Sequence, residues 1–128
     1  MTDPAMEADH ELFDPEVTDQ YVEAQVARQR WFWVLLLKDG PRDDFEDAEA
    51  AALQAAHLRH IFTLRKRGQL TLVGPVREAR PLRGIAVLTV ETREEAEALF
   101  ANDPWILAGG MTAEIRPFFT MPGASLPG

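Results

Sequence analysis

The feature that most constrains the fold of this chain is a run of seven apolar residues, Trp31–Leu37. The run is rich in aromatic and branched side chains and is too short for a typical helix, so it predicts a strand. A strand that is apolar at consecutive positions needs cover on both of its faces. The run is also far shorter than the roughly 20 residues of a membrane-spanning helix. We therefore expect a buried strand in a globular domain and no association with a membrane.

Five further elements are predicted after this strand. They are a helix over Asp44–Arg67 that Gly68 ends, a strand over Gln69–Val73, a strand over Gly84–Val90, a helix that begins with the Thr92–Glu95 capping box, and a strand over Thr112–Thr120. This order predicts an α+β fold of the ferredoxin-like βαββαβ type. In such a fold an antiparallel four-stranded sheet carries both helices on one face.

The second face of the sheet also needs cover, because the first strand is apolar on both sides. Either a helix from the N-terminal extension or a second copy of the sheet could cover it. Face-to-face pairing of two sheets predicts a homodimer. The expected aromatic contributors to such an interface are Trp31, Trp33, Phe118 and Phe119.

Charge divides the chain near residue 30. Residues 1–30 carry eight acidic and two basic side chains, whereas the rest of the chain carries 13 and 11. Asp14 followed by Pro15 is typical of a helix start, so this acidic extension is expected to be partly helical, with residues 1–12 mobile. Residues 31–122 are expected to form the folded domain, and residues 123–128 an irregular tail.

The composition argues against several classes of protein. Without cysteine there is no disulfide, thiolate nucleophile or thiolate zinc site. A net charge of −8 disfavours nucleic-acid binding, and the one basic cluster, Arg65–Arg67, suits the end of a helix. Glycine-rich phosphate motifs are absent, and the single serine, Ser125, lies in the tail. The first residues are also unlike a secretory signal, so we expect a cytoplasmic protein. We also expect that the protein needs no cofactor.

One histidine, His57 on the long helix, is the candidate for proton transfer. The residues expected on its buried face are Leu53, Leu58, Ile61 and Leu64, with His60 at the edge. His57 is either an inert core histidine or a proton carrier that faces a pocket, since imidazole titrates near neutral pH. His57 and His60 are three residues apart with no acid beside them, so no metal site is expected on this helix.

Two short motifs after the helix allow a structural and a functional interpretation. Asp103 before Pro104 is typical of a helix N-cap, but a carboxylate could also orient an imidazole. Gly74-Pro75 closes a strand, and its role is either a tight turn or a place where backbone amides approach a ligand. Spacing alone does not bring Asp103 and His57 together.

Several short segments together resemble one known family. They are Ala56-His57-Leu58, Gly68-Gln69-Leu70, Val73-Gly74-Pro75, Asn102-Asp103-Pro104-Trp105, Ala108-Gly109 and Ile115-Arg116-Pro117-Phe118. In this order and spacing they resemble the YciI-like (YCII-related) family over about Trp31–Pro122. The resemblance implies a dimeric α+β barrel related to muconolactone isomerases, with a pocket centred on His57 and Asp103. Trp105 stands where a tyrosine is common in the family.

The residues and the resemblance together predict a small enzyme that acts on a cyclic or aromatic organic acid. Isomerase, lyase or dehydrohalogenase chemistry is expected, since some relatives remove chloride from hydroxylated rings. His57 would move the proton and Asp103 would hold and polarise it. The expected substrate-binding residues are Gly74, Pro75, Trp105 and Phe118. The alternatives are a non-catalytic small-ligand-binding or accessory module and, below it, a haem-handling protein or a cofactor-free monooxygenase on the same barrel.

Overall fold

The computed structural model describes residues 12–128, and the chain divides into two compact units. The larger unit is Trp31–Phe118, and the smaller unit combines the chain up to Arg30 with Phe119–Gly128. The predicted mobility of residues 1–12 falls, except for Leu12, outside the described residues.

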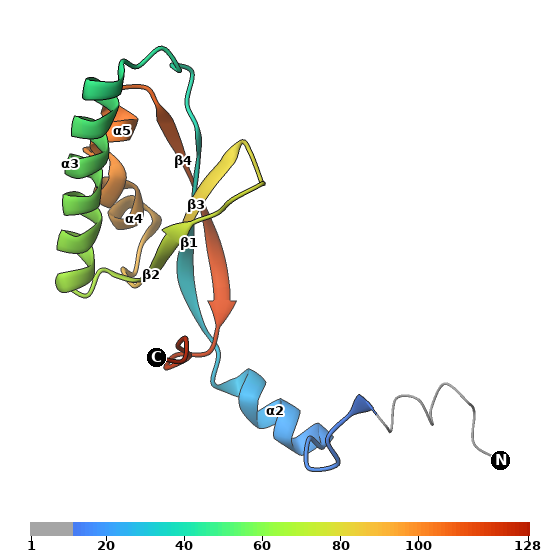
Figure 1. Cartoon of the computed structure of the whole chain (residues 1–128). Helices are drawn as coiled ribbons and strands as arrows, with labels where there is room; N and C mark the ends of the chain where they lie inside the picture. The colour runs from blue at the N-terminus through green and yellow to red at the C-terminus, as the bar shows by residue number, and fades with distance from the viewer. Residues whose placement is uncertain (1–11) are drawn as a thin grey trace. The chain divides into compact units, whose positions relative to one another are not determined.

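The sheet and its helices follow the predicted order. The elements are β1 (Arg30–Asp39), α3 (Asp47–Lys66), β2 (Leu70–Pro75), β3 (Leu82–Leu88), α4 (Arg93–Phe100), the short α5 (Pro104–Leu107) and β4 (Met111–Thr120). The strands lie in the order β2-β3-β1-β4, and β3 is antiparallel to both β1 and β2. Figure 1 shows all three of these helices on the same side of the sheet. The predicted α+β fold with its four-stranded antiparallel sheet is confirmed.

The hydrophobic core lies between the sheet and the helices. Leu35 of β1 is fully buried and lies opposite Ala86 of β3, which is also fully buried. Alternate residues of a strand point to opposite faces, so Trp33 shares the helix-facing side with Leu35. Trp33 packs against the core there, and its ring lies 4.9 Å from the guanidinium carbon of Arg93. The prediction that Trp33 contributes to the opposite face is therefore wrong.

The other face of the sheet is apolar and only half covered. Val34 lies opposite Val87, and Leu36 lies opposite Ile85. These four side chains are half-buried, in contrast to their fully buried neighbours on the helix side. The expectation that β1 is apolar on both faces is met within this unit.

Local capping residues set the ends of the helices. The φ angle of Gly68 is +74°, a left-handed conformation that glycine adopts readily, and α3 ends just before it. The Thr92 hydroxyl accepts a hydrogen bond from the Glu95 amide over 3.1 Å, which is one of the two hydrogen bonds of the predicted capping box. Helix α3 starts at Asp47, three residues later than predicted.

The helix of the acidic extension, α2 (Asp19–Ala27), begins later than predicted. Its N-cap is Thr18, whose hydroxyl accepts from the Tyr21 amide. Asp14 instead accepts a hydrogen bond from the Glu16 amide over 2.9 Å, which closes a turn at Pro15. The prediction of a helix start at Asp14 is therefore wrong, and none of the residues of α2 is buried.

Candidate active site

His57 is held inside the larger unit by its position on α3. Its residue surface is 5% exposed, and Ile61 and Leu64, four and seven residues later, are buried on the same face of the helix. Leu58 does not continue this buried stripe, because 42% of it is exposed. It lines a cavity beside His57 instead, so the prediction for Leu58 is wrong.

Asp103 is the polar partner of His57. The carboxylate is fully buried, and its Oδ1 lies 2.6 Å from Nδ1 of His57. Its other oxygen, Oδ2, accepts hydrogen bonds from the amides of Trp105 (3.1 Å) and Ile106 (3.4 Å) at the start of α5. Asp103 thus fills both predicted roles at once, because each oxygen serves one of them.

The arrangement of donors fixes which nitrogen of His57 is free. An ionised carboxylate only accepts hydrogen bonds, so Nδ1 carries the proton that points at Asp103. His57 makes no hydrogen bond through Nε2 to any residue from 12 to 128. No buried side-chain nitrogen or oxygen in this range lacks a partner, so Nε2 is accessible, on the side where His57 lines the cavity. In the neutral ring Nε2 therefore carries a lone pair that is free of partners among these residues, on a residue that lines the cavity.

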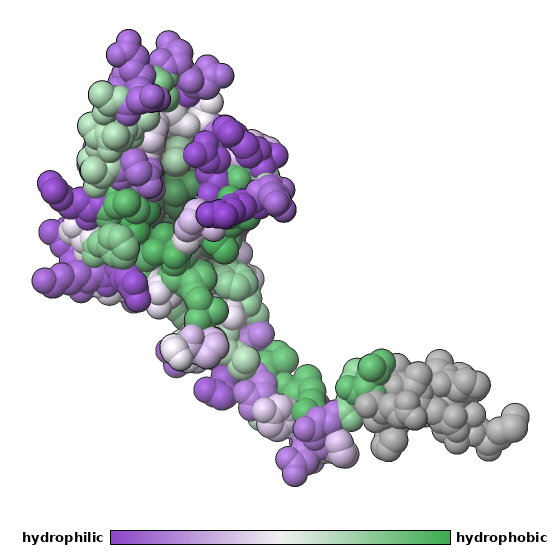
Figure 2. Space-filling model, viewed as in Figure 1, coloured by the Kyte–Doolittle hydropathy of each residue, from purple (hydrophilic) through white to green (hydrophobic). Residues whose placement is uncertain are grey.

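The cavity beside His57, called the histidine cavity below, has a volume of about 440 Å³. It lies between α3 and the ends of β2 and β3, where Figure 2 shows apolar surface beside the hydrophilic β2–β3 turn. Its apolar wall is formed by Leu37, Leu58, Ile61, Phe62, Val73, Val76, Ile85 and Met111, and its polar side chains are Gln54, His57, Arg77 and Arg83. A cavity of this size accommodates a small organic molecule.

Gly74 and Pro75, two of the predicted binding residues, line the histidine cavity at the end of β2. Gly74 lies opposite Ile85 and Pro75 lies opposite Gly84 in the antiparallel pair with β3. A Cβ atom added at Gly74 would meet nothing within 4 Å. The missing side chain therefore leaves open space next to the strand backbone.

Trp105 lies on the wall of a neighbouring cavity and is not among the residues around the histidine cavity. Its ring packs edge-on against Phe45, with the ring centroids 5.1 Å apart, and its indole N–H donates to Gln54 over 2.9 Å. Gln54 in turn lines the histidine cavity. Trp105 is thus connected to the site by two hydrogen bonds. Its indole donates to Gln54, and its backbone amide donates to the Asp103 carboxylate.

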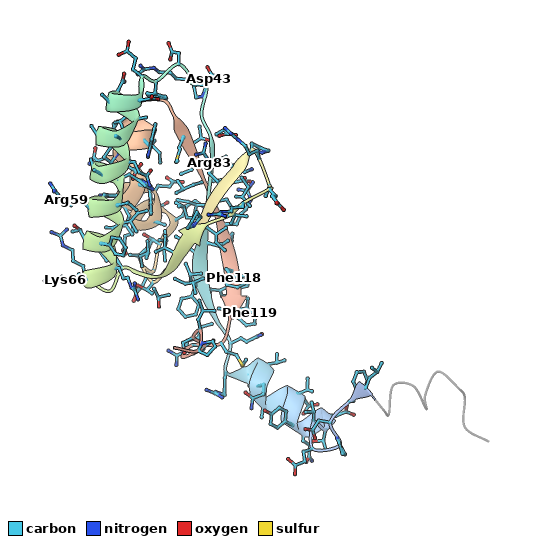
Figure 3. All side chains as sticks on the ribbon, in the orientation of Figure 1. Asp43, Arg59, Lys66, Arg83, Phe118 and Phe119 are labelled. Carbon is cyan, nitrogen blue, oxygen red and sulfur yellow. The ribbon has the colours of Figure 1, made fainter. Side chains whose placement is uncertain are left out.

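Phe118 is not among the residues that line either cavity. Met111, at the start of β4, borders both, and Phe118 follows seven residues later on the same strand. Seven residues of strand span roughly 23 Å, so Phe118 lies toward the other end of the sheet. Figure 3 shows Phe118 on β4 well away from Arg83 of β3, which borders both cavities. The expectation that Phe118 lines this pocket does not fit the geometry of the single chain.

The neighbouring cavity, called the ion-pair cavity below, has a volume of about 290 Å³. Asp39 on its wall accepts two hydrogen bonds from Arg80 and one from Arg83. These guanidinium groups lower the pKa of Asp39 from 3.8 to about 2. Arg42, also on this wall, is paired with Asp44 and Glu49. Most charges of the ion-pair cavity therefore neutralise one another.

His60 takes no part in either cavity. Its Nε2 lies 2.7 Å from the carbonyl oxygen of Leu99, to which it donates, and its ring packs edge-on against Phe100. His60 is therefore a structural histidine, the role that the sequence left open as an alternative for His57. Within residues 12–128 no three histidine or acidic side chains come together as a metal site. In the same range, no helix is both long and apolar enough to cross a membrane.

Sequence analysis missed two groups of side chains at the histidine cavity. Leu58 and Phe62 are half-exposed apolar residues one turn apart on α3, and Arg77 and Arg83 flank the β2–β3 turn. The positions of the two arginines could have been predicted from the sequence. Gly74-Pro75 ends the strand, so the arginines of the turn that follows lie at the same end of the sheet. The exposure of Leu58 could not have been predicted from the sequence, because its helical position is also compatible with the core.

No curated protein matches this chain. A solved structure to which it is similar is that of 5-chloro-2-hydroxyhydroquinone dehydrochlorinase (TftG) from Burkholderia phenoliruptrix AC1100, in complex with 2,5-dihydroxybenzoquinone. The two share 20% sequence identity with a TM-score of 0.49, over 68% of this chain and 92% of the other. The identity is too low for the likeness to indicate a shared reaction.

The family model for the YCII-related domain matches residues 31–119. This stretch holds His57, Asp103, Gly74 and both cavities, and it is more than half of the chain. The resemblance drawn from the short motifs is confirmed by this match. The chain belongs to the YCII-related family.

Proposed function

We propose that this chain is a small enzyme that moves protons on cyclic or aromatic organic acids, with isomerase, lyase or dehydrohalogenase chemistry. The observation that carries the proposal is the 2.6 Å contact between His57 Nδ1 and Asp103 Oδ1 beside a cavity of about 440 Å³. A carboxylate on one ring nitrogen orients the imidazole and stabilises its protonated form. The other nitrogen is then the one that can accept a proton.

In the proposed reaction Nε2 of His57 takes a proton from a C–H or O–H group of the substrate. The electron pair left behind forms a new double bond. In an elimination the pair expels a halide, which leaves with the electrons of the carbon–halogen bond. In an isomerisation the imidazolium returns the proton to another carbon. Asp103 faces the imidazolium in either case and keeps its charge paired.

The side chains around the histidine cavity favour some of these reactions over others. Among its lining residues, none is aspartate, glutamate, lysine or tyrosine, so His57 is the one side chain of this wall suited to take up and return a proton. A reaction that needs a separate general acid has no donor in the described wall. Loss of a halide needs none, and a single-base isomerisation reuses the same proton, so the proposal favours these two.

A non-catalytic binding module is the second candidate. The wall holds few side chains that can transfer a proton, which favours a binding module. Binding of a ligand requires only the apolar wall and the polar groups at the cavity. Deuterium exchange separates the two candidates. An enzyme labilises an acidic C–H bond of a bound molecule, whereas a binding module leaves it intact.

Homodimer formation is part of the proposal. The half-buried apolar face with Val34, Leu36, Ile85 and Val87 supports it, because such a face is stable in water only when covered. Sedimentation of wild type and of Val34→Glu tests it, and a monomer at micromolar concentration in both would refute it. A cytoplasmic location is likewise proposed, from the lack of cysteine.

The test of catalysis follows wash-in of deuterium by NMR in D2O with a panel of cyclic and aromatic keto and hydroxy acids. His57→Asn keeps a donor near Asp103 but removes Nε2, so exchange should fall by about 10²–10⁴-fold. His60→Asn is the matched control, because His60 bonds a backbone carbonyl outside the cavity. Equal exchange in wild type and His57→Asn would exclude His57 as the base, and no exchange with any acid would favour the binding module.

A further inference from the structure

The charge of the histidine cavity is opposite to that of the whole chain. The chain carries a net charge of −8, yet the charged residues on this wall are the two arginines, Arg77 and Arg83. None of the lining residues is acidic. Arginine side chains at a cleft favour anions even in an acidic protein, because the field inside a cleft depends on the nearest charges.

Arg77 is the arginine of this wall without a protein partner. It makes no hydrogen bond or ion pair with any residue that the structure describes, whereas Arg83 is bonded to Asp39 over 2.9 Å. Arg80, the third arginine of the loop, is held by two hydrogen bonds to the same carboxylate. The guanidinium of Arg77 is therefore available to a ligand.

The backbone keeps Arg77 beside Arg83. The Val76 amide donates to the Arg83 carbonyl over 2.9 Å, which closes the base of the β2–β3 turn one residue before Arg77. Figure 3 shows Arg83 at this end of the sheet. Asp39 would stay paired with Arg80 if Arg83 exchanged its single bond for a ligand. The turn thus offers one free guanidinium and a second that can be recruited.

We propose that Arg77, with Arg83 beside it, forms an anion-binding end of the histidine cavity, which takes the carboxylate of the ligand. A planar guanidinium matches a carboxylate with two parallel hydrogen bonds. The apolar residues Leu58, Phe62 and Val73 then surround the rest of the molecule. That the bound carboxylate belongs to a substrate rests on the proposed function; the binding of carboxylates does not.

The experiment compares acids with their neutral amides. Benzoate and benzamide form one pair of probes, and cyclohexanecarboxylate and its carboxamide form a second, each titrated by NMR into full-length protein. Wild type should bind the acid of at least one pair about tenfold more tightly than the amide. Arg77→Gln should lose most of this preference, while Arg77→Lys, which keeps the charge, should retain part of it.

Arg59→Gln is the matched control. Arg59 is an exposed arginine on α3 that points away from the sheet, and it lines neither cavity (Figure 3). The preference for acids should persist in this variant. Three results would overturn the inference: equal affinity for acid and amide in wild type, no saturable binding of either acid, or an unchanged preference in Arg77→Gln.

Failure of this inference is distinguishable from failure of the proposed function. His57→Asn should lower deuterium exchange by about 10²–10⁴-fold but keep the preference for carboxylates, because His57 is not the anion-binding group. Exchange without a carboxylate preference would leave the enzyme and remove the role of Arg77. A carboxylate preference without exchange would leave the anion site and favour the binding module.

Discussion

The two cavities of the larger unit are neighbours, with Arg83 and Met111 on the wall of both, but they differ in how their polar groups are paired. In the ion-pair cavity Asp39 is saturated by arginines, and Arg42 is paired with acids. In the histidine cavity Nε2 of His57 and the Arg77 guanidinium have no partner among residues 12–128. Paired charges hold a structure together, whereas unpaired ones at a cavity are ready for a ligand.

The largest effect is expected from a variant that removes the buried carboxylate. Asp103→Ala leaves Nδ1 of His57 and two amides of α5 without an acceptor. We expect the free energy of unfolding to fall by about 2–4 kcal/mol, from the lost hydrogen bonds and the lost cap. Urea unfolding measures this. Asp43→Ala, at an exposed carboxylate of the ion-pair cavity, should change stability by less than about 0.5 kcal/mol, and equal losses in both variants would contradict the comparison.

The next effect distinguishes the packing of the two cavities. A Cβ atom at Gly110, beside the ion-pair cavity, would lie 2.6 Å from the Trp105 ring and 3.0 Å from Phe45. Gly110→Ala should therefore cost about 1–3 kcal/mol through overpacking. Gly74→Ala should be tolerated, because a Cβ atom there meets nothing within 4 Å. Thermal unfolding of the two variants checks this, and a larger loss for Gly74→Ala would show that the space beside Gly74 is not open.

The smallest effect is a pH dependence confined to the ion-pair cavity. The pKa of Asp39 is lowered from 3.8 to about 2, so its stabilising ion pairs are complete above pH 3.8 and are lost as the pH falls toward 2. The stability gap between wild type and Asp39→Asn should be constant near neutral pH and shrink across this acidic window. Arg77→Gln should show no such gap. If the difference in stability between wild type and Asp39→Asn instead grew at low pH, Asp39 would not be the carboxylate that the arginines stabilise.

Much of the fold was predictable because its signals are local. Thr92 and Asp103 cap helices through amides two or three residues away, and Gly68 ends α3 through its own φ angle. The prediction of a helix start at Asp14 failed on a similar signal, since Asp-Pro-Glu suits a turn as well as a helix.

The candidate site was predictable only in part. His57 and Asp103 are 46 residues apart, so their contact depends on how α3 and α5 pack, and only the family resemblance paired them. The same motifs predict Trp105 and Phe118 in the pocket, but Phe118 lies too far along β4 and the indole of Trp105 packs at the ion-pair cavity. The free guanidinium of Arg77 depends on which acids its neighbours reach, and spacing along the chain does not contain that information.

The double use of Asp103 has a consequence for redesign of this protein. Because one oxygen caps α5 and the other holds His57, a substitution there alters the reactivity of the imidazole and the folding of the chain together. Libraries that seek new ligands should leave Asp103 fixed and randomise Leu58, Phe62 and Arg77. These three residues line the cavity and do not cap a helix. Selection could then act on specificity alone.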